Sequence, residues 1–441
     1  STQGQSSELG VGLTRILGGA RDMVLKGQMD LATRQSESHL QATGAPISST
    51  KDHQLRWRLS ADNERLSNDP KRAELGLTLL ESGFLLSIVQ LAGLSLAVFM
   101  GLLADGMGLR RSMLRGLCLL ALASGLGGWA TSVTALLVLR AIEGLGFLMV
   151  ALPAPALIRR LVPPARLSGM LGLWGAYMPT GTALALLLGP LFIPDWGWRA
   201  WWGLFSGVSL ATALWLVRSV PADPPGVQAL AGQGALGRLR RTLGARGPWL
   251  VALTFGMYSG QWLAVVGVLP SIYTAAGLSG ALLGGLTALA AAVNVVGNMA
   301  SGRLLQRGWA PRNTLWLGFG AMALGSTLAF VPFTESLPWL RFVGVLVFSG
   351  IGGLVPGTLF VLAVRLAPGE QQVATTVGWV QQLSALGQFV GPPCVAAVAA
   401  RAGGWQLTPL VTLACCACGM ALAWAAGHAL EHARQADAPA P

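Results

Sequence analysis

The stretch Gly101-Leu-Leu-Ala-Asp-Gly-Met-Gly-Leu-Arg-Arg111 decides the fold of this chain. It ends a long apolar segment with Asp105, two glycines and a pair of arginines. A carboxylate at the end of an apolar membrane helix is costly unless a partner meets it. The glycines allow a tight turn, and the arginines stay in water at a membrane face. The stretch therefore predicts a short hinge between two membrane helices.

The composition around this stretch is that of an integral membrane protein. Of the 441 residues, 53% are hydrophobic and only 11% are charged, whereas a soluble protein carries roughly 25% charged residues. The net charge of +12 raises nucleic-acid binding as an alternative. However, residues 1–81 are neutral overall, and the excess bases lie in short loops between apolar runs of about 20 residues. We therefore expect a lipid bilayer as the partner and no nucleic acid.

Apolar runs and breaks predict an all-α integral membrane fold with two pseudo-symmetric helical bundles. A break rich in Pro, Gly and Arg divides the runs into five spans and then six. We expect spans at 79–104, 113–130, 134–157, 167–192, 199–218, 248–272, 279–302, 313–332, 338–363, 372–400 and 405–428.

The same breaks predict the domain organisation. We interpret the chain as a polar N-terminal segment that is poorly ordered or non-native, an N-terminal helical bundle, a cytoplasmic linker, a C-terminal helical bundle and a tail. These parts are 1–73, 74–218, 219–247, 248–430 and 431–441, respectively. Within the first part, 8–33 has weak helical amphipathicity that glycines oppose, so any helix there is loose.

Loop charges predict the orientation in the membrane. One set of breaks holds nearly all the arginines of residues 82–441, and the opposite set holds only Arg199, Arg341 and Arg401. Basic loops stay on the cytoplasmic side, so the C-terminus lies in the cytoplasm. We expect a multi-pass protein of the cell's inner (plasma) membrane. The first span then begins outside, although 1–73 contains no apolar core of a signal peptide.

The opening stretch recurs weakly 201 residues later. Gly93, Ala97, Gly101 and Asp105 form a stripe with a spacing of four, and the equivalent stripe further along is Asn294, Asn298, Gly302 and Gln306. Small residues at this spacing let helices approach closely in lipid. Two equivalent halves joined by a basic linker are typical of secondary transporters.

These motifs resemble those of the major facilitator superfamily of secondary transporters. Gly101-x3-Asp105-x2-Gly108-x-Arg110-Arg111 is similar to the signature between that family's second and third helices, with Gly106 where a basic residue is usual. Arg140-Ala-Ile-Glu143-Gly-Leu-Gly146 resembles the fourth-helix motif. A narrower resemblance, to the cyanate permease and nitroimidazole transporter group, comes from Tyr258-Ser-Gly-Gln-Trp262 and Trp174-Gly-Ala-Tyr-Met-Pro179.

The resemblance implies six helices in each bundle, so the family's first helix has no counterpart among the spans. Residues 1–73 occupy its place. An incomplete or wrongly started reading frame explains this best. A working eleven-helix variant, unrecognised processing and a partner helix are the alternatives.

Two charges, Arg140 and Glu143, lie well inside a span. Each costs roughly 2.5–3.5 kcal/mol at mid-membrane. A pair three residues apart can satisfy itself on neighbouring helix turns. The alternative is that Arg140 holds an anionic substrate or controls proton movement while Glu143 titrates, and the resemblance supports a proton-linked arginine.

Polar side chains in otherwise apolar spans are the candidates for lining a substrate cavity. A buried amide needs a partner, which water or a substrate supplies in a cavity, although a helix–helix hydrogen bond is the alternative for each one alone. The candidates are Tyr177, Tyr258, Gln261, Trp262, Asn294, Gln381 and Gln382.

The resemblance implies secondary active transport of a small solute, an anion or a neutral compound, by alternating access linked to protons. Gly101, Asp105, Gly108, Arg110 and Arg111 would form the gating motif. Asp105 would pair with arginines such as Arg159 or Arg160 and with the start of the eleventh family helix. An inactive or incomplete transporter fragment and a non-transporting membrane sensor are the rival functions. The sequence shows no nucleophile with its base and no metal-ligand cluster, so we expect no enzyme, no cofactor, no metal and a monomer.

Overall fold

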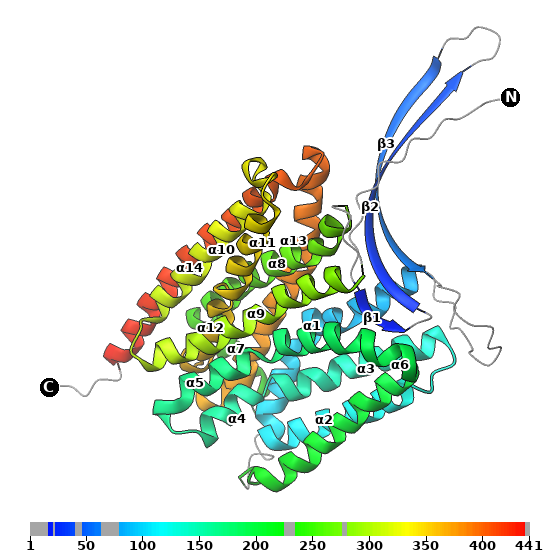
Figure 1. The fold of residues 1–441 in the computed structure, drawn as a ribbon. Coiled ribbons are helices and arrows are strands. Elements are labelled where there is room, and N and C mark those ends of the chain that lie inside the picture. Colours follow the sequence, from blue (N-terminus) through cyan, green and yellow to red (C-terminus); the bar gives the residue numbers. More distant parts are fainter. Residues whose placement is uncertain are drawn as a thin grey trace.

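Two groups of helices lie side by side, one before and one after the linker (Figure 1). This computed structural model describes residues 16–20, 23–39, 46–62, 79–224, 234–275 and 280–436. The first group contains α1 (Leu79–Met107), α2 (Leu109–Gly127), α3 (Val133–Ala151), α4 (Ala154–Leu161), α5 (Pro164–Gly175) and α6 (Tyr177–Ser219).

The linker contributes a helix of its own, α7 (Ala235–Gly244), before the second group begins. The second group contains α8 (Arg246–Ala275), α9 (Gly280–Gln306), α10 (Pro311–Phe330), α11 (Pro338–Gly350), α12 (Leu354–Arg365), α13 (Val373–Ala402) and α14 (Thr408–Ala436). The expected all-α membrane architecture with two bundles is therefore confirmed for the described residues from Leu79 onward.

Each predicted span coincides with helix, but in the described part of the chain only nine helical stretches are long and apolar enough to cross a membrane. The two predicted spans outside this set are α2 and α10. Arginines near the start of α2 and glycines and polar residues along α10 dilute their apolar content. The expected spans 167–192 and 199–218 share α6, a single long helix that bends at Gly197. The φ of Gly197 is 79°, in the left-handed region that glycine adopts at little cost.

The described residues of the N-terminal segment form an antiparallel sheet instead of the loose helix expected over 8–33, while the interpretation of 1–73 as poorly ordered or non-native stays a prediction. Its strands, in the order β1-β2-β3, are β1 (Ile16–Ala20), β2 (Met23–His39) and β3 (Pro46–Asp62). The register pairs Leu31 with Leu55 and, one residue earlier, Asp30 with Arg56. This period-two alternation of apolar and charged pairs favours strands. The β2–β3 hairpin extends away from the helices (Figure 1).

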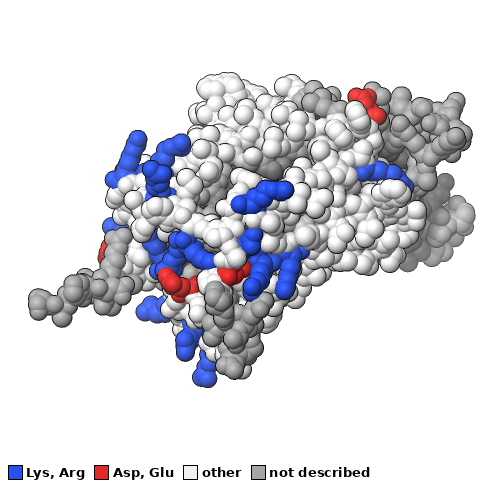
Figure 2. Space-filling view, turned by 90° about the horizontal axis from the view of Figure 1, so that it is seen from below, with Lys and Arg blue, Asp and Glu red and all other residues white. Residues whose placement is uncertain are grey.

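Basic side chains gather toward one end of the molecule, with a broad uncharged surface beyond them (Figure 2). We call this end the basic end. It holds the α1–α2, α3–α5, α9–α10 and α12–α13 connections, with Arg110, Arg111, Arg159, Arg160, Arg303, Arg307 and Arg365.

Glycines allow the close approach of α8 and α13, two helices of the second group. A Cβ at Gly391 would collide with the carbonyl oxygen of Gly260, and one at Gly387 with that of Gly256. The helix continues through Pro392 and Pro393 just beyond this contact. Close backbone approach of this kind is how helices associate in lipid.

We predict that Gly391→Ala destabilises the protein, because the added methyl group would clash with backbone atoms of Gly260, which cannot move aside as a side chain can. Overpacking of this kind costs about 1–3 kcal/mol. The measurement is the apparent Tm in detergent, which should fall by several degrees. The control is Gly203→Ala on α6, where an added Cβ meets nothing within 4 Å. Equal Tm values for the two variants would contradict the assignment of this contact.

Candidate functional site

Asp105 at the end of α1 binds the first turn of α13. Its Oδ1 accepts a hydrogen bond from the backbone N–H of Ala374 at 3.1 Å, and its Oδ2 accepts from the N–H of Thr375 at 2.7 Å. The Thr375 hydroxyl donates to the same Oδ2 at 2.6 Å. A helix N-terminus has unpaired N–H groups and a partial positive charge, so a carboxylate is its natural partner. The Asp105 carboxylate, which would be unfavourable in an apolar span without a partner, is therefore hydrogen-bonded by the other half of the molecule.

The two helices approach because small residues line the contact. A Cβ at Gly101 would collide with the carbonyl of Ala374, and a Cβ at Gly378 would collide with that of Ala97. Further along, a Cβ at Gly93 would be 3.4 Å from the Cβ of Ala385. The stripe therefore packs backbone against backbone until Asp105.

The arginines expected to pair with Asp105 have other partners, so that part of the prediction is wrong. Arg159 lies 3.6 Å from the carboxylate of Glu370, and Arg160 lies 3.4 Å from that of Asp223. The cation whose charge acts on Asp105 is Arg238 of α7, a buried residue of the linker. The sequence analysis placed 219–247 as a cytoplasmic linker but predicted no helix within it.

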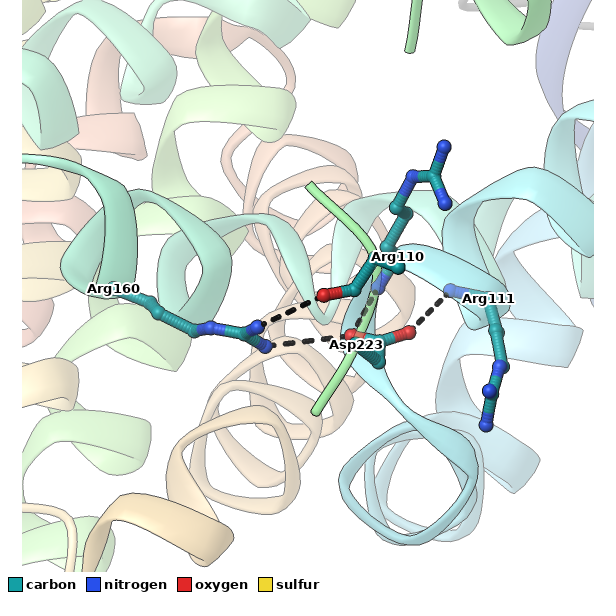
Figure 3. Close-up of polar contacts among 5 residues, drawn as sticks. Arg110, Arg111, Arg160 and Asp223 are labelled. Carbon is teal, nitrogen blue, oxygen red and sulfur yellow. Dashed lines mark hydrogen bonds and ion pairs between the residues drawn. The ribbon is translucent and has the colours of Figure 1, made fainter. Parts of the chain in front are cut away.

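Asp223 is a functional candidate that the sequence did not reveal (Figure 3). Its carboxylate accepts from the backbone N–H groups of Arg110 at 3.2 Å and Arg111 at 2.9 Å, at the start of α2. Gly108 precedes that turn with a φ of 102°, and a Cβ there would be 2.5 Å from Asp223 Oδ2. Asp223 thus caps α2 and ties the linker to α4 through Arg160. In the sequence, the feature that could have drawn attention to Asp223 is that it is the one acid of the stretch 219–247 and lies between prolines.

The second copy of the stripe makes the equivalent contact with α5. A Cβ at Gly302 would meet the carbonyl of Ser168 at 2.6 Å, and a Cβ at Gly172 would meet the carbonyl of Asn298 at 2.8 Å. Gln306, which stands where Asp105 stands in the first copy, donates to the carbonyl of Arg166 at 3.3 Å. The two halves are thus joined twice in related ways, and only the first contact carries an acid.

A cavity of about 370 Å³ lies between the two halves. Its lining includes six of the expected residues, which are Arg140, Tyr177, Tyr258, Trp262, Asn294 and Gln381. This size is in the range of cavities that bind small molecules.

The wall from the second half is a hydrogen-bonded network. Asn294 donates to the hydroxyl of Tyr258 at 2.9 Å and to the carbonyl of Ser349 at 2.7 Å. Asn298 donates to Asn294 Oδ1 at 2.9 Å, while its own Oδ1 is buried without a partner among the described residues. Trp262 donates its indole N–H to Ser349 Oγ at 3.0 Å. The network fixes these side chains at the cavity wall.

Gln261 and Gln382 do not line this cavity, which corrects their assignment. Gln261 is buried against α14, where its Oε1 lies 3.3 Å from the Cys416 thiol. Gln382 accepts from the backbone N–H of Val98 at 3.2 Å, inside the α1–α13 contact. Each adjoins a residue that does line the cavity, and neighbouring residues on a helix point about 100° apart.

The wall from the first half carries a charged pair well inside a span. Arg140 Nη1 lies 2.6 Å from Glu143 Oε2, and the hydroxyl of Ser124 donates to Glu143 Oε1 at 2.5 Å. The Arg140 guanidinium also sits 4.8 Å from the ring centre of Trp202. The Arg140 side chain keeps 34% exposure and reaches the cavity, whereas that of Glu143 keeps 7% and is not part of the lining.

Two glutamines that the sequence reasoning missed close the cavity wall between the halves. Gln90 of α1 donates to Gln388 Oε1 of α13 at 2.6 Å, and both line the cavity. The signals were the single amide of the span 79–104 and, on the span 372–400, a further glutamine seven residues after Gln381. Within the described residues, no group of three or more His, Cys, Asp or Glu is placed to hold a metal ion.

Comparison with known proteins gives one family and several partial relatives. A model of the Major Facilitator Superfamily matches residues 69–392. The chain is 35% identical over 117 residues to the Multidrug resistance protein Stp of Mycobacterium tuberculosis (strain ATCC 25618 / H37Rv), which covers 26% of this chain and 22% of that protein. It is 30% identical over 128 residues to the Putative niacin/nicotinamide transporter NiaP of Bacillus subtilis (strain 168), covering 29% and 32%. The matched stretches therefore span less than a third of these relatives.

Solved structures match over more of the chain. The E. coli fucose:proton symporter FucP aligns with a TM-score of 0.67 at 16% identity, covering 79% of this chain and 91% of that one. The human organic anion transporter MFSD10 aligns with a TM-score of 0.59 at 20% identity, covering 79% and 83%. At these identities the likeness establishes the fold.

We predict that Asp223→Ala frees the start of α2, because two backbone N–H groups lose their acceptor. Loss of a helix cap costs about 0.5–2 kcal/mol. Hydrogen–deuterium exchange at Arg110, Arg111 and Ser112 should accelerate by up to about 30-fold. Glu335→Ala, an exposed acid between α10 and α11, is the control. Unchanged exchange in Asp223→Ala would refute the cap.

Proposed function

We propose a function from the premise that this chain belongs to the Major Facilitator Superfamily: it carries out secondary active transport of a small solute by alternating access. The single observation that carries the proposal is the cavity between two related halves that are joined at the basic end. A solute site between halves that can rock is the arrangement of such transporters. The basic end would face the cytoplasm of a plasma-membrane protein, in line with its arginines.

The contacts at the basic end support an outward-facing form of the cycle. Three contacts join the halves on this side of the cavity. Asp105 of α1 accepts from the start of α13, Gln306 of α9 donates to the chain at α5, and Arg365 donates to Ser168 at 3.2 Å. Opening toward the cytoplasm would have to break each of them. A carboxylate at a helix N-terminus contributes up to ~2 kcal/mol, a bias that a transport cycle can reverse.

Arg140 and Glu143 are the residues we assign to substrate and proton. Glu143 already accepts from Arg140 and from Ser124. An anion that binds the same guanidinium would compete with the Glu143 carboxylate for it. This reasoning favours a small anion over a neutral compound. The partial relatives, named as a multidrug resistance protein and a putative niacin/nicotinamide transporter, support small-molecule transport. The narrower kinship with cyanate permeases stays a prediction.

We predict that Arg140→Ala abolishes uptake of labelled small anions into proteoliposomes, because among the described residues Arg140 is the one cation that lines the cavity. The variant should elute as wild type from size-exclusion chromatography. Arg199→Ala is the control, since Arg199 stacks on Trp198 and donates to the carbonyl of Gly128 outside the cavity. Wild-type uptake by Arg140→Ala would refute the assignment.

We predict that Asp105→Asn shifts the protein toward the form open at the basic end, because the amide loses the charge that α13 attracts. The readout is alkylation of Ser259→Cys, at a residue that lines the cavity, in an otherwise cysteine-free protein, by an impermeant thiol reagent applied from the basic side. Its rate should rise severalfold. The control is Glu370→Gln, whose exposed ion pair with Arg159 contributes roughly 0–1 kcal/mol. If Asp105→Asn and Glu370→Gln show the same alkylation rate and the same transport rate, the assignment of Asp105 to the gate is wrong.

A further inference from the structure

The cavity lining combines one cation with many aromatic rings. Arg140 is the only charged residue of the lining among the described residues. Two edge-on ring pairs line the cavity from opposite halves. Trp201 and Phe205 of α6 lie 4.9 Å apart at 79°, and Phe255 and Phe360 of the second half lie 5.5 Å apart at 61°. No acid reaches the cavity from the described residues, so a cationic solute would have no charge partner there.

The Nε side of the Arg140 guanidinium suits a carboxylate. Glu143 takes the donor at Nη1 and Trp202 covers one face, which fixes the plane of the guanidinium. The Nε–H is buried and has no hydrogen-bond partner within the described residues. A guanidinium presents parallel N–H groups along its Nε/Nη2 edge, and this fork matches the two oxygens of a carboxylate. A phosphate or a dicarboxylate would bring more charge than one half-neutralised arginine can balance.

The second half offers hydrogen bonds rather than charge. The Tyr258 hydroxyl accepts from Asn294, so its own proton remains to be donated, and Asn298 Oδ1 is a fully buried acceptor without a partner among the described residues. Both residues line the cavity. A group that both accepts and donates, such as a ring hydroxyl or ring nitrogen with water, would complete this wall.

We propose that the substrate is a monocarboxylate carried on an aromatic or heteroaromatic ring. Its carboxylate binds Arg140, its ring packs among the ring pairs, and a polar ring substituent faces Tyr258 and Asn298. The volume of about 370 Å³ holds one or two rings. This inference rests on the proposed transport function and names the substrate class of the same cavity.

The test is a binding panel by isothermal titration of the full chain in nanodiscs at pH 7.5. Sodium benzoate has both ring and charge, cyclohexanecarboxylate has the charge without aromaticity, benzamide has the ring without the charge, and acetate has the charge alone. Aromatic contacts add about 0.5–1.5 kcal/mol beyond area burial, so benzoate should bind roughly 2- to 12-fold tighter than cyclohexanecarboxylate. Benzamide and acetate should bind more weakly than both.

Matched variants assign the contacts. Phe205→Leu should reduce the benzoate-to-cyclohexanecarboxylate ratio toward one, while Phe389→Leu, on the exposed face of α13 and outside the lining, should leave it unchanged. Equal affinities for the two acids in wild type, or an unchanged ratio in Phe205→Leu, would overturn the proposal.

Transport measurements separate this failure from failure of the proposed function. If proteoliposomes accumulate a neutral solute such as L-fucose and the panel acids do not bind, the substrate class is wrong and transport stands. If benzoate binds as expected but no gradient drives its accumulation above that of empty liposomes, the substrate class stands and the transport proposal is wrong.

Discussion

The rest of this structure depends on the close approach of α1 and α13, which ends where the Asp105 carboxylate meets the first N–H groups of α13. Backbone contact over Gly101 and Gly378 brings the halves together, and the carboxylate finds in the other half the donors that its own helix cannot supply. The cavity exists between the halves because this contact holds them at one end. A bias of up to ~2 kcal/mol from such a cap corresponds to about a 30-fold population ratio, which is large enough to select a state and small enough to reverse.

The two halves repeat this design with different chemistry. Gln306 takes the place of Asp105, and its amide bonds one carbonyl of α5 instead of a helix N-terminus. Both acidic helix caps therefore involve the first half: besides Asp105, Asp223 of the linker caps α2 and holds the linker against Arg160. The cavity divides in the same way. Arg140 supplies charge from the first half, and the network around Asn294 supplies neutral hydrogen bonds from the second.

The sequence predicts what depends on local pattern. Apolar runs predict the helices, small residues at a spacing of four predict the tight contacts, and the stranded acid at 105 predicts that a partner exists. What depends on distant pairing was not predictable. Asp223 meets α2 across more than a hundred residues, and Arg160 pairs with Asp223 rather than Asp105. Gln261 and Gln382 differ from their cavity-lining neighbours only in helical phase. In the N-terminal segment, period-two alternation prevailed over weak helical amphipathicity.

We propose that the two halves rock about the cavity and that the basic end opens and closes. The most direct measurement is the distance between spin labels at exposed positions 115 and 307, one in each half at the basic end, in otherwise cysteine-free protein. Double electron–electron resonance with and without substrate and a proton gradient would report it. Rocking of the halves predicts a short distance between the two labels in the resting protein and a second population with a longer distance during transport. A single unchanged distance under every condition would contradict it.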